Sequence, residues 1–215
     1  MENNNIIEDL IIRYPQLLPV KENIQLAADC LIKCYQQGRK VLVCGNGGSC
    51  SDSDHIVGEL MKGFEDKRPI TGTLKTRLSD FGGERGDYLA AKLQQGLPAI
   101  SLTAHSALIT AVANDTDANL IFAQQVVGYG NEGDVLIGIT TSGNSQNVVD
   151  AIITAKAKGM NVIGLTGESG GKMKTLCDIL INVPGRRTAF VQELHLPVYH
   201  ALCLMIEYYF FKNLP

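Results

Sequence analysis

Short, almost entirely apolar runs alternate along this chain with longer stretches in which apolar residues recur at helical spacing. The apolar runs are rich in β-branched residues and predict strands at residues 41–44, 99–103, 135–139, 162–166 and 179–183. Because these runs are continuously apolar, each strand is expected to be buried on both faces, as in a parallel sheet covered by helices. Such βα alternation places ligands beyond the carboxyl ends of the strands.

Three further helices are predicted outside this alternation. Residues 6–18 and 20–37 have amphipathic spacing, with Pro15 and Pro19 marking the break between them, and they form an N-terminal extension over 1–38. Residues 188–211 are apolar on more than one face. A helix of that kind must be buried from several sides, which favours packing against another subunit.

Residues 60–97 are the irregular part of the pattern. They combine Lys67-Arg68-Pro69 and Gly82-Gly83 with a short helical pattern over 87–93. The connection is long for an α/β fold, which indicates a functional, interfacial or mobile segment. A tolerated surface insertion is the alternative, because long loops cost little extra free energy to lengthen.

Composition narrows the class of protein. The 215 residues are enough for one domain with a full core, and a net charge of -3 gives no basic surface for nucleic acid. The six cysteines lack paired metal-binding spacing and are expected to be free thiols in a reducing compartment. The N-terminus is polar, and no apolar run approaches the roughly 18 residues of a membrane span. We therefore expect a cytoplasmic protein with no membrane partner.

A hydroxyl-rich turn follows the strand at 135–139. It carries Thr140, Thr141, Ser142 and Ser145 and opens a predicted helix over 147–158. A helix N-terminus presents unpaired N–H groups and partial positive charge, so hydroxyl donors beside it would hold an anionic ligand well. The alternative is that Ser145 is an ordinary N-cap and the threonines simply end a strand.

A glycine-rich turn follows the strand at 41–44. In Gly45-Asn46-Gly47-Gly48-Ser49 the glycines let backbone amides approach a ligand closely, and Ser49 is expected to cap the next helix. The turn lacks the third glycine of a dinucleotide fingerprint and the lysine of a nucleotide-binding P-loop. Two short cradles of this kind suit a small sugar phosphate.

A possible metal pair lies on the helix after the glycine turn. His55 and Glu59 are four residues apart, so both side chains project from one helix face toward the same volume. Such a pair can share a metal ion, and imidazole and carboxylate suit zinc. A hydrogen-bonded surface pair is the alternative at this spacing.

Together these motifs resemble the sugar isomerase (SIS) domain, and more closely the phosphoheptose isomerase family. The resemblance spans most of the chain and rests, in order, on Cys44-Gly45-Asn46-Gly47-Gly48-Ser49, His55 with Glu59, Asn114-Asp115, Thr141-Ser142-Gly143-Asn144-Ser145, Leu165-Thr166-Gly167 with Gly170-Gly171-Lys172-Met173, and Gln192-Glu193 with His200. It implies a single SIS domain over 1–215, with a five-stranded parallel sheet in a flavodoxin-like three-layer sandwich.

The resemblance also implies an activity, aldose–ketose isomerisation of a sugar phosphate, with sedoheptulose 7-phosphate as the expected substrate and a homotetramer as the expected assembly. Glu59 and His200 would move the protons, and one zinc would be held by His55, Glu59, Gln192 and His200. Substrate would be bound by Asn46, Gly47, Gly48, Ser49, Glu59, Asn114, Asp115, Thr140, Thr141, Ser142, Ser145 and Gln192.

The implied zinc set raises a geometrical difficulty. On one straight helix His200 would stand about 12 Å along the axis from Gln192. Pro197 between them could kink or interrupt the helix, or His200 could come from a neighbouring subunit. His195 is the competing histidine, with a surface or capping role as its alternative.

Three departures from the family pattern bear on the substrate more than on the reaction type. Ala189 stands where the family often has an acidic residue, Cys50 stands where many members have His, and the 60–97 connection is longer than expected. Two rival functions stay open. One is a non-catalytic SIS module, either a sugar-phosphate sensor or an adaptor like the bacterial factor that associates with the replication initiator. The other is an isomerase for a pentose or hexose phosphate.

Overall fold

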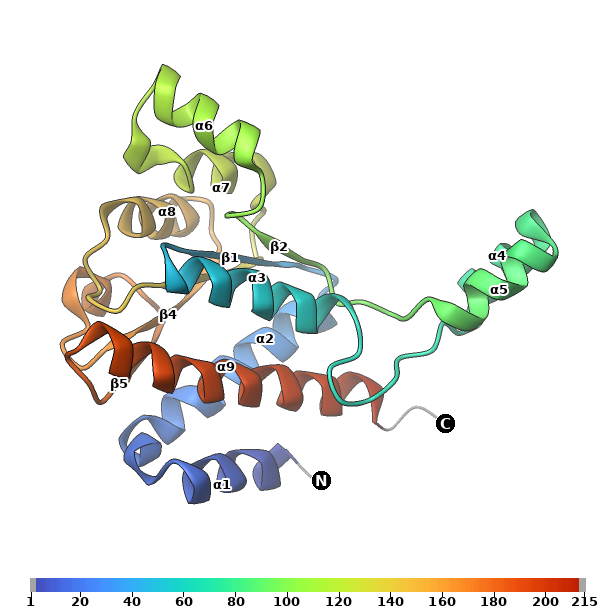
Figure 1. The fold of residues 1–215 in the computed structure, drawn as a ribbon, viewed down its shortest axis with the longest axis horizontal. Coiled ribbons are helices and arrows are strands. Elements are labelled where there is room, and N and C mark those ends of the chain that lie inside the picture. The colour runs from blue at the N-terminus through green and yellow to red at the C-terminus, as the bar shows by residue number, and fades with distance from the viewer. Residues whose placement is uncertain (1–2, 213–215) are drawn as a thin grey trace.

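The computed structural model describes residues 3–212, and a five-stranded parallel sheet forms the centre of this region (Figure 1). The strands are β1 Val41–Gly45, β2 Ala99–Ser101, β3 Val135–Ile139, β4 Asn161–Gly167 and β5 Ile179–Val183. Their spatial order β2-β1-β3-β4-β5 is the flavodoxin-like order, which confirms the predicted sheet. Residues 1–2 and 213–215 of the expected domain lie outside the described residues.

Helices cover both faces of the sheet because successive strand residues point to opposite sides. Val41 and Val43 pack with one helical layer, whereas Leu42 and Cys44 pack with the other. The first layer contains α1 Asn3–Arg13, α2 Lys21–Gln36, α3 Gly48–Met61 and α9 Thr188–Phe211. The opposite side carries α6 Ser106–Asp115, η2 Ala118–Leu120, α7 Ala123–Tyr129, α8 Gln146–Ala157 and η3 Gly171–Thr175 (Figure 1). The result is the expected three-layer arrangement.

The N-terminal helices begin and end differently from the prediction. A 3₁₀ helix, η1 Pro15–Val20, joins α1 to α2, and it contains both prolines that were expected to separate two α-helices. Pro15 occupies its first turn, where a missing N–H costs no internal hydrogen bond. Leu17 and Val20 are buried, so the break is a packed part of the fold.

Helix α9 has the predicted bounds and lies within the fold. Among the described residues it is the one helix that passes for a membrane span by length and composition, contrary to the expectation that no segment would. Yet 61% of its most apolar window is buried inside the fold. It packs against α1, α2 and α3, so most of its apolar surface is covered by its own chain. It is therefore a core helix of this fold.

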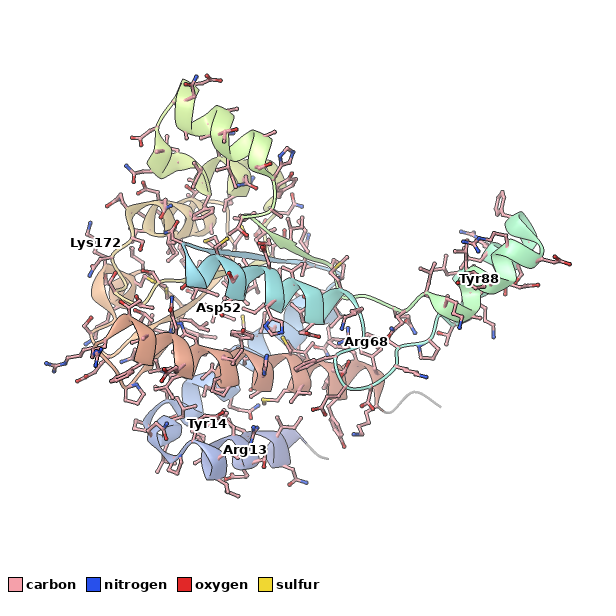
Figure 2. The ribbon with its side chains drawn as sticks, in the orientation of Figure 1. Arg13, Tyr14, Asp52, Arg68, Tyr88 and Lys172 are labelled. Carbon is pink, nitrogen blue, oxygen red and sulfur yellow. The ribbon has the colours of Figure 1, made fainter. Side chains whose placement is uncertain are left out.

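Residues 60–97 form a helical hairpin that projects from the body of the protein (Figure 1). Helices α4 Gly72–Gly82 and α5 Glu84–Lys92 meet at Gly83, and Tyr88 lies on the projecting part (Figure 2). The sequence predicted only one short helix here, over 87–93, so α4 was missed. Leu74, Leu78 and Phe81 do have helical spacing, but α4 buries none of its residues and Phe81 is 93% exposed in the described chain.

Candidate active site

A polar cavity of about 330 Å³ opens where β1 and β3 end. The pairing register sets Gly45 beside Ile139, so the glycine turn and the hydroxyl turn leave the sheet abreast of each other. The cavity is lined by Asn46, Gly47, Gly48, Ser49, Ile139, Thr140, Thr141, Ser145, Thr188 and Gln192. Most of the predicted substrate-binding residues therefore meet at one place, the point where strand order reverses.

The glycine turn delivers the chain directly into α3. Gly47 has φ +56°, a conformation that favours glycine, and it occupies the N-cap position. The expectation that Ser49 caps this helix was wrong, because α3 begins at Gly48 and Ser49 is its second residue. Gly47, Gly48 and Ser49 line the cavity, so the first turn of α3 and its partial positive charge face it. Gly47 has no side chain that could cap this end of the helix.

The hydroxyl turn brings Thr140, Thr141 and Ser145 to the cavity. Ser145 does occupy the N-cap position of α8, but its side chain makes no capping bond in the described chain. Instead, Ser145 Oγ and Thr140 Oγ1 are 2.8 Å apart and hydrogen bonded. Ser142 lines a neighbouring opening that also contains Glu168 and Arg186, and its Oγ is 3.4 Å from Thr140 Oγ1. Ser145 and Thr140 are therefore the better placed anion donors.

A pair of asparagines joins the two turns. Asn46 and Asn147 exchange two amide hydrogen bonds of 2.9 Å each, one in each direction. Asn147 was not among the predicted site residues, and neither was Thr188, which lines the cavity from α9. The sequence held no signal for Asn147, because the bond joins residues 101 positions apart.

Gln192 reaches the glycine turn from α9. A side chain at Gly48 would collide with the Gln192 amide, so only glycine at this position leaves room for Gln192. Gln192 thus lines the cavity together with the two cradles. Helix α9 runs unbroken through Pro197, so Pro197 does not bring His200 round to the same spot.

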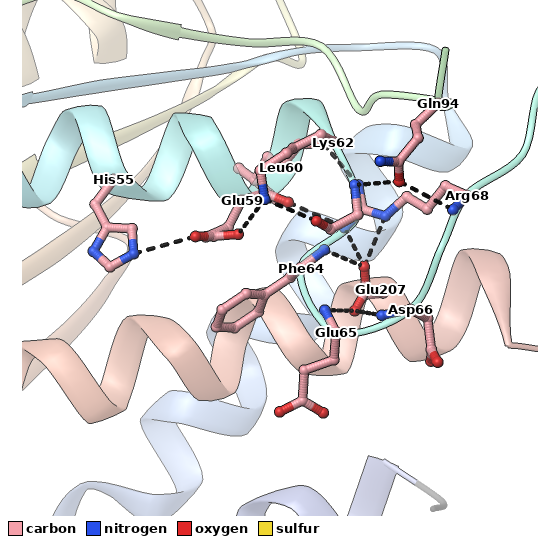
Figure 3. Close-up of polar contacts among 11 residues, drawn as sticks. His55, Glu59, Leu60, Lys62, Phe64, Glu65, Asp66, Arg68, Gln94 and Glu207 are labelled. Atoms are coloured by element: carbon pink, nitrogen blue, oxygen red, sulfur yellow. Dashed lines mark hydrogen bonds and ion pairs between the residues drawn. The ribbon is translucent and has the colours of Figure 1, made fainter. Parts of the chain in front are cut away.

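His55 and Glu59 form the predicted pair on α3. His55 Nε2 lies 3.2 Å from Glu59 Oε1, and the two side chains are 41% and 13% exposed (Figure 3). Lys62 Nζ stands 3.4 Å from the second oxygen of Glu59. The pair is therefore open to a ligand on the imidazole side and largely enclosed on the carboxylate side.

His200 packs against this pair from α9. Its ring lies edge-on to His55, with 5.0 Å between centroids, and 5.2 Å from Phe64. Burial, followed by the nearby His55, lowers the pKa of His200. Its Nε2 atom is buried without a hydrogen-bond partner among residues 3–212. Within that range no group of three or more His, Cys, Asp or Glu is arranged to hold a metal.

A buried ion pair holds the backbone beneath Glu59. Arg68 and Glu207 are almost inaccessible to solvent and lie 2.9 Å apart. Arg68 also donates to the carbonyl oxygens of Leu60 and Glu59, at 2.8 and 3.1 Å (Figure 3). The pair thus ties the base of the hairpin to the end of α3 and to α9. A glutamate inside an apolar helix was the sequence signal that could have revealed it.

Glu207 also accepts hydrogen bonds from three successive backbone N–H groups. These belong to Phe64, Glu65 and Asp66, at 2.8 to 3.1 Å. Burial alone would raise the pKa of Glu207, but the three N–H groups and Arg68 outweigh it and lower the pKa below its ordinary value. Glu207 is therefore held as a carboxylate.

The remaining predicted residues lie apart from the cavity in a single chain. Asn114 and Asp115 are exposed in the last turn of α6, where Asn114 donates to Asp115 over 2.8 Å. His195 is neither a surface nor a capping residue, because it is completely buried on α9. Burial lowers the pKa of His195 to about 4, so its imidazole is neutral.

The chain is similar to known proteins over most of its length. A family model described as SIS domain matches residues 18–80 and 84–167. A phosphoheptose isomerase from Nitratidesulfovibrio vulgaris is 42% identical over 177 residues, which is 82% of this chain and 73% of that protein. Another from Aneurinibacillus thermoaerophilus is 36% identical over 207 residues, 96% of this chain and 90% of that protein.

Solved structures agree with these sequence matches. A phosphoheptose isomerase structure from Neisseria gonorrhoeae has a TM-score of 0.73 and 33% identity, covering 93% of this chain and 94% of that one. One from Francisella tularensis has a TM-score of 0.72 and 35% identity, covering 95% of each chain.

Proposed function

The chain belongs to the phosphoheptose isomerase family of SIS-domain proteins, and we propose that it isomerises sedoheptulose 7-phosphate to glycero-manno-heptose 7-phosphate in heptose biosynthesis. The observation that carries this proposal is the cavity between the two turns, with a histidine–carboxylate pair on the helix that follows one of them. A sugar phosphate has an anionic end that suits the cavity and a reactive carbonyl end that suits the histidine–carboxylate pair.

The phosphate end is assigned to the cavity. Helices α3 and α8 both begin there, so both present partial positive charge and N–H donors to it. Thr140 and Ser145 add hydroxyl donors on the same side. Asn46 and Gln192 are placed to bond sugar hydroxyl groups.

The reactive end requires a proton to move between neighbouring carbons through an enediol. Glu59 is the proposed base that takes the carbon-bound proton, and His200 is its partner acid or base. Lys62 Nζ stands 3.4 Å from one oxygen of Glu59, on the side away from His55. The small exposure of Glu59 limits competition from bulk water.

We further infer one zinc ion per subunit, with His55, Glu59, Gln192 and His200 as ligands. Two ligands about 2.1 Å from a tetrahedral metal stand roughly 3.4 Å apart, close to the 3.2 Å between His55 Nε2 and Glu59 Oε1. His200, whose ring packs against His55 and whose Nε2 has no hydrogen-bond partner among residues 3–212, is the proposed third donor. When bound, zinc would polarise the oxygens of the developing enediolate.

The decisive experiment combines metal analysis with a substrate panel. Purified protein should contain about one zinc per chain and should isomerise sedoheptulose 7-phosphate, and a chelator should abolish both. His55→Ala should lose the metal, whereas His105→Ala, which removes an exposed histidine that caps α6, should keep it. Preference for a pentose or hexose phosphate would identify a different isomerase. Sugar-phosphate binding without turnover on any substrate would favour the non-catalytic sensor or adaptor.

The phosphate cradle predicts a loss of affinity on removal of its hydroxyls. Replacing Thr140 and Ser145 together with Ala should weaken substrate binding at least tenfold, because each charge-assisted hydrogen bond contributes about 1.5–3 kcal/mol. Calorimetric titration measures this directly. Ser169→Ala, in the neighbouring opening, is the control and should bind normally. Unchanged affinity in the double variant would reject the cradle.

We also propose a cytoplasmic homotetramer with active sites at subunit interfaces. Six free cysteines support a reducing compartment, and exposed Ile12, Phe190 and Leu196 support a further interface. Because Gln192 and His200 lie apart on one continuous helix, Gln192 of the partner subunit would complete the zinc set.

Assembly of this kind predicts complementation between inactive subunits. Light scattering should give a mass near four chains, and mixing inactive Glu59→Gln with inactive Gln192→Ala subunits should restore part of the activity. Mixing two batches of the same variant is the control. A monodisperse, active monomer would overturn the shared site.

A further inference from the structure

The hydroxyl group of Tyr199 connects two side chains of α3. It donates to Asp52 Oδ1 over 3.2 Å, and it lies 3.0 Å from His55 Nδ1. Tyr199 is buried on α9, and its ring packs edge-on against His55 with 5.5 Å between centroids. Figure 2 shows Asp52 on the side of α3 that faces α9. The three side chains therefore form a fixed bridge between two core helices.

This bridge determines where the imidazole of His55 carries its proton. A tyrosine hydroxyl has one hydrogen, and a carboxylate such as Asp52 can only accept. With that hydrogen directed at Asp52, the Tyr199 oxygen can interact with His55 only as an acceptor. His55 Nδ1 must then be the protonated nitrogen. In the neutral ring Nε2 is left with a free lone pair.

The free lone pair faces the acidic neighbour of His55. Nε2 stands 3.2 Å from Glu59 Oε1 on the exposed side of the ring. Two lone-pair donors that face each other at this distance are mutually repulsive unless a cation or a proton lies between them. Among residues 3–212, Asp52 Oδ2 is buried without a partner, so the Asp52 carboxylate is oriented by Tyr199 alone.

We propose that Asp52 and Tyr199 are positioning residues that hold His55 in its Nδ1–H form and direct bare Nε2, together with Glu59, at a divalent cation. The inference rests on the proposed function, because it assigns the outer support of the same metal site. Metal-bound histidines commonly donate their other ring N–H to an oxygen acceptor, which fixes the ring and raises its basicity. Here Tyr199 is that acceptor and Asp52 orients it.

The first test reads the position of the proton without metal or substrate. The chain has four histidines, so nitrogen-15 histidine labelling gives a small set of ring signals, and His55→Ala assigns those of His55. In metal-free wild type at a pH where the ring is neutral, His55 should show a protonated Nδ1 and a bare Nε2. In Tyr199→Phe the proton should move to Nε2. A protonated Nε2 in wild type would overturn the proposal.

The second test measures zinc affinity by competition with a chelator. Tyr199→Phe and Asp52→Asn should each weaken zinc binding about 10–100-fold. Tyr208→Phe, farther along the same helix, is the matched control and should match wild type. If wild type binds zinc and both variants bind it equally well, the positioning role is wrong while the metal site stands. If wild type binds no zinc, the proposed metal site itself fails, whatever the tautomer of His55.

Discussion

Replacing Glu59 with Gln should lower kcat by about 10²–10⁴-fold while the sugar phosphate still binds. The amide keeps the shape of the carboxylate but cannot accept a proton from carbon. Phosphate binding is assigned to a different place, the cavity at the ends of β1 and β3. We therefore expect kcat to fall much more than affinity, as measured by steady-state kinetics and by calorimetric titration.

Two comparisons separate the base from its other possible roles. Glu65→Gln is the matched control, because the Glu65 side chain is exposed nearby and only its backbone N–H contacts Glu207. Zinc content should be measured in the Glu59 variant as well. If the variant loses turnover but keeps its zinc, Glu59 acts as a base. If the variant loses both zinc and turnover, Glu59 acts as a metal ligand. Full turnover in Glu59→Gln would refute both assignments.

The elements that the sequence predicted well are those with a dense local pattern. β3, β5 and α9 have the predicted bounds, because each is an apolar run between clear polar or glycine boundaries. The glycine turn and the hydroxyl turn lie where the sequence predicted them, since each directly follows a buried strand. Their convergence follows from the parallel register that sets Gly45 beside Ile139.

Two wrong predictions concern the residue at which α3 begins and the number of helices in residues 60–97. The first depends on the backbone conformation of one residue, and the second on a helix that packs against no core. Ser49 satisfies the preference for an N-cap, but the positive φ of Gly47 starts α3 one residue before it. Helix α4 was missed because it begins and ends at glycines, which suggest a loop. None of its residues is buried in the described chain, so packing against a core does not support its apolar spacing. Where a helix begins, and whether a short one forms, depends on the packing of the surrounding chain.

The long-range contacts of the site could not be predicted from spacing at all. Tyr199 meets His55 across 144 positions, and Arg68 meets Glu207 across 139. In the sequence Arg68 belonged to an irregular basic segment, with no indication that it is completely buried. Only the packing of α3 against α9 brings these side chains together.

Removing Arg68 should destabilise the protein more than any other single change considered for this site. Arg68→Met leaves the Glu207 carboxylate buried without its cation and frees the carbonyl groups of Glu59 and Leu60. Breaking a buried pair by removing one partner costs about 3–5 kcal/mol. Urea unfolding at one fixed protein concentration should show a loss of this size. Arg186→Met, which breaks an exposed pair with Glu168, is the control and should cost about 1 kcal/mol or less.

The pH dependence of stability supplies an independent check on Glu207. Its pKa is lowered in the folded state, so its contribution is complete above the ordinary value of 4.5 and is lost as pH falls through the lowered pKa. Wild type should therefore lose part of its stability below about pH 4.5, and Glu207→Gln should lose less over the same range. Because Arg68 holds the carbonyl of Glu59, Arg68→Met should also lower kcat at temperatures where the variant is still folded. An Arg68→Met protein with wild-type stability and turnover would show that the buried pair supports neither the fold nor the position of Glu59.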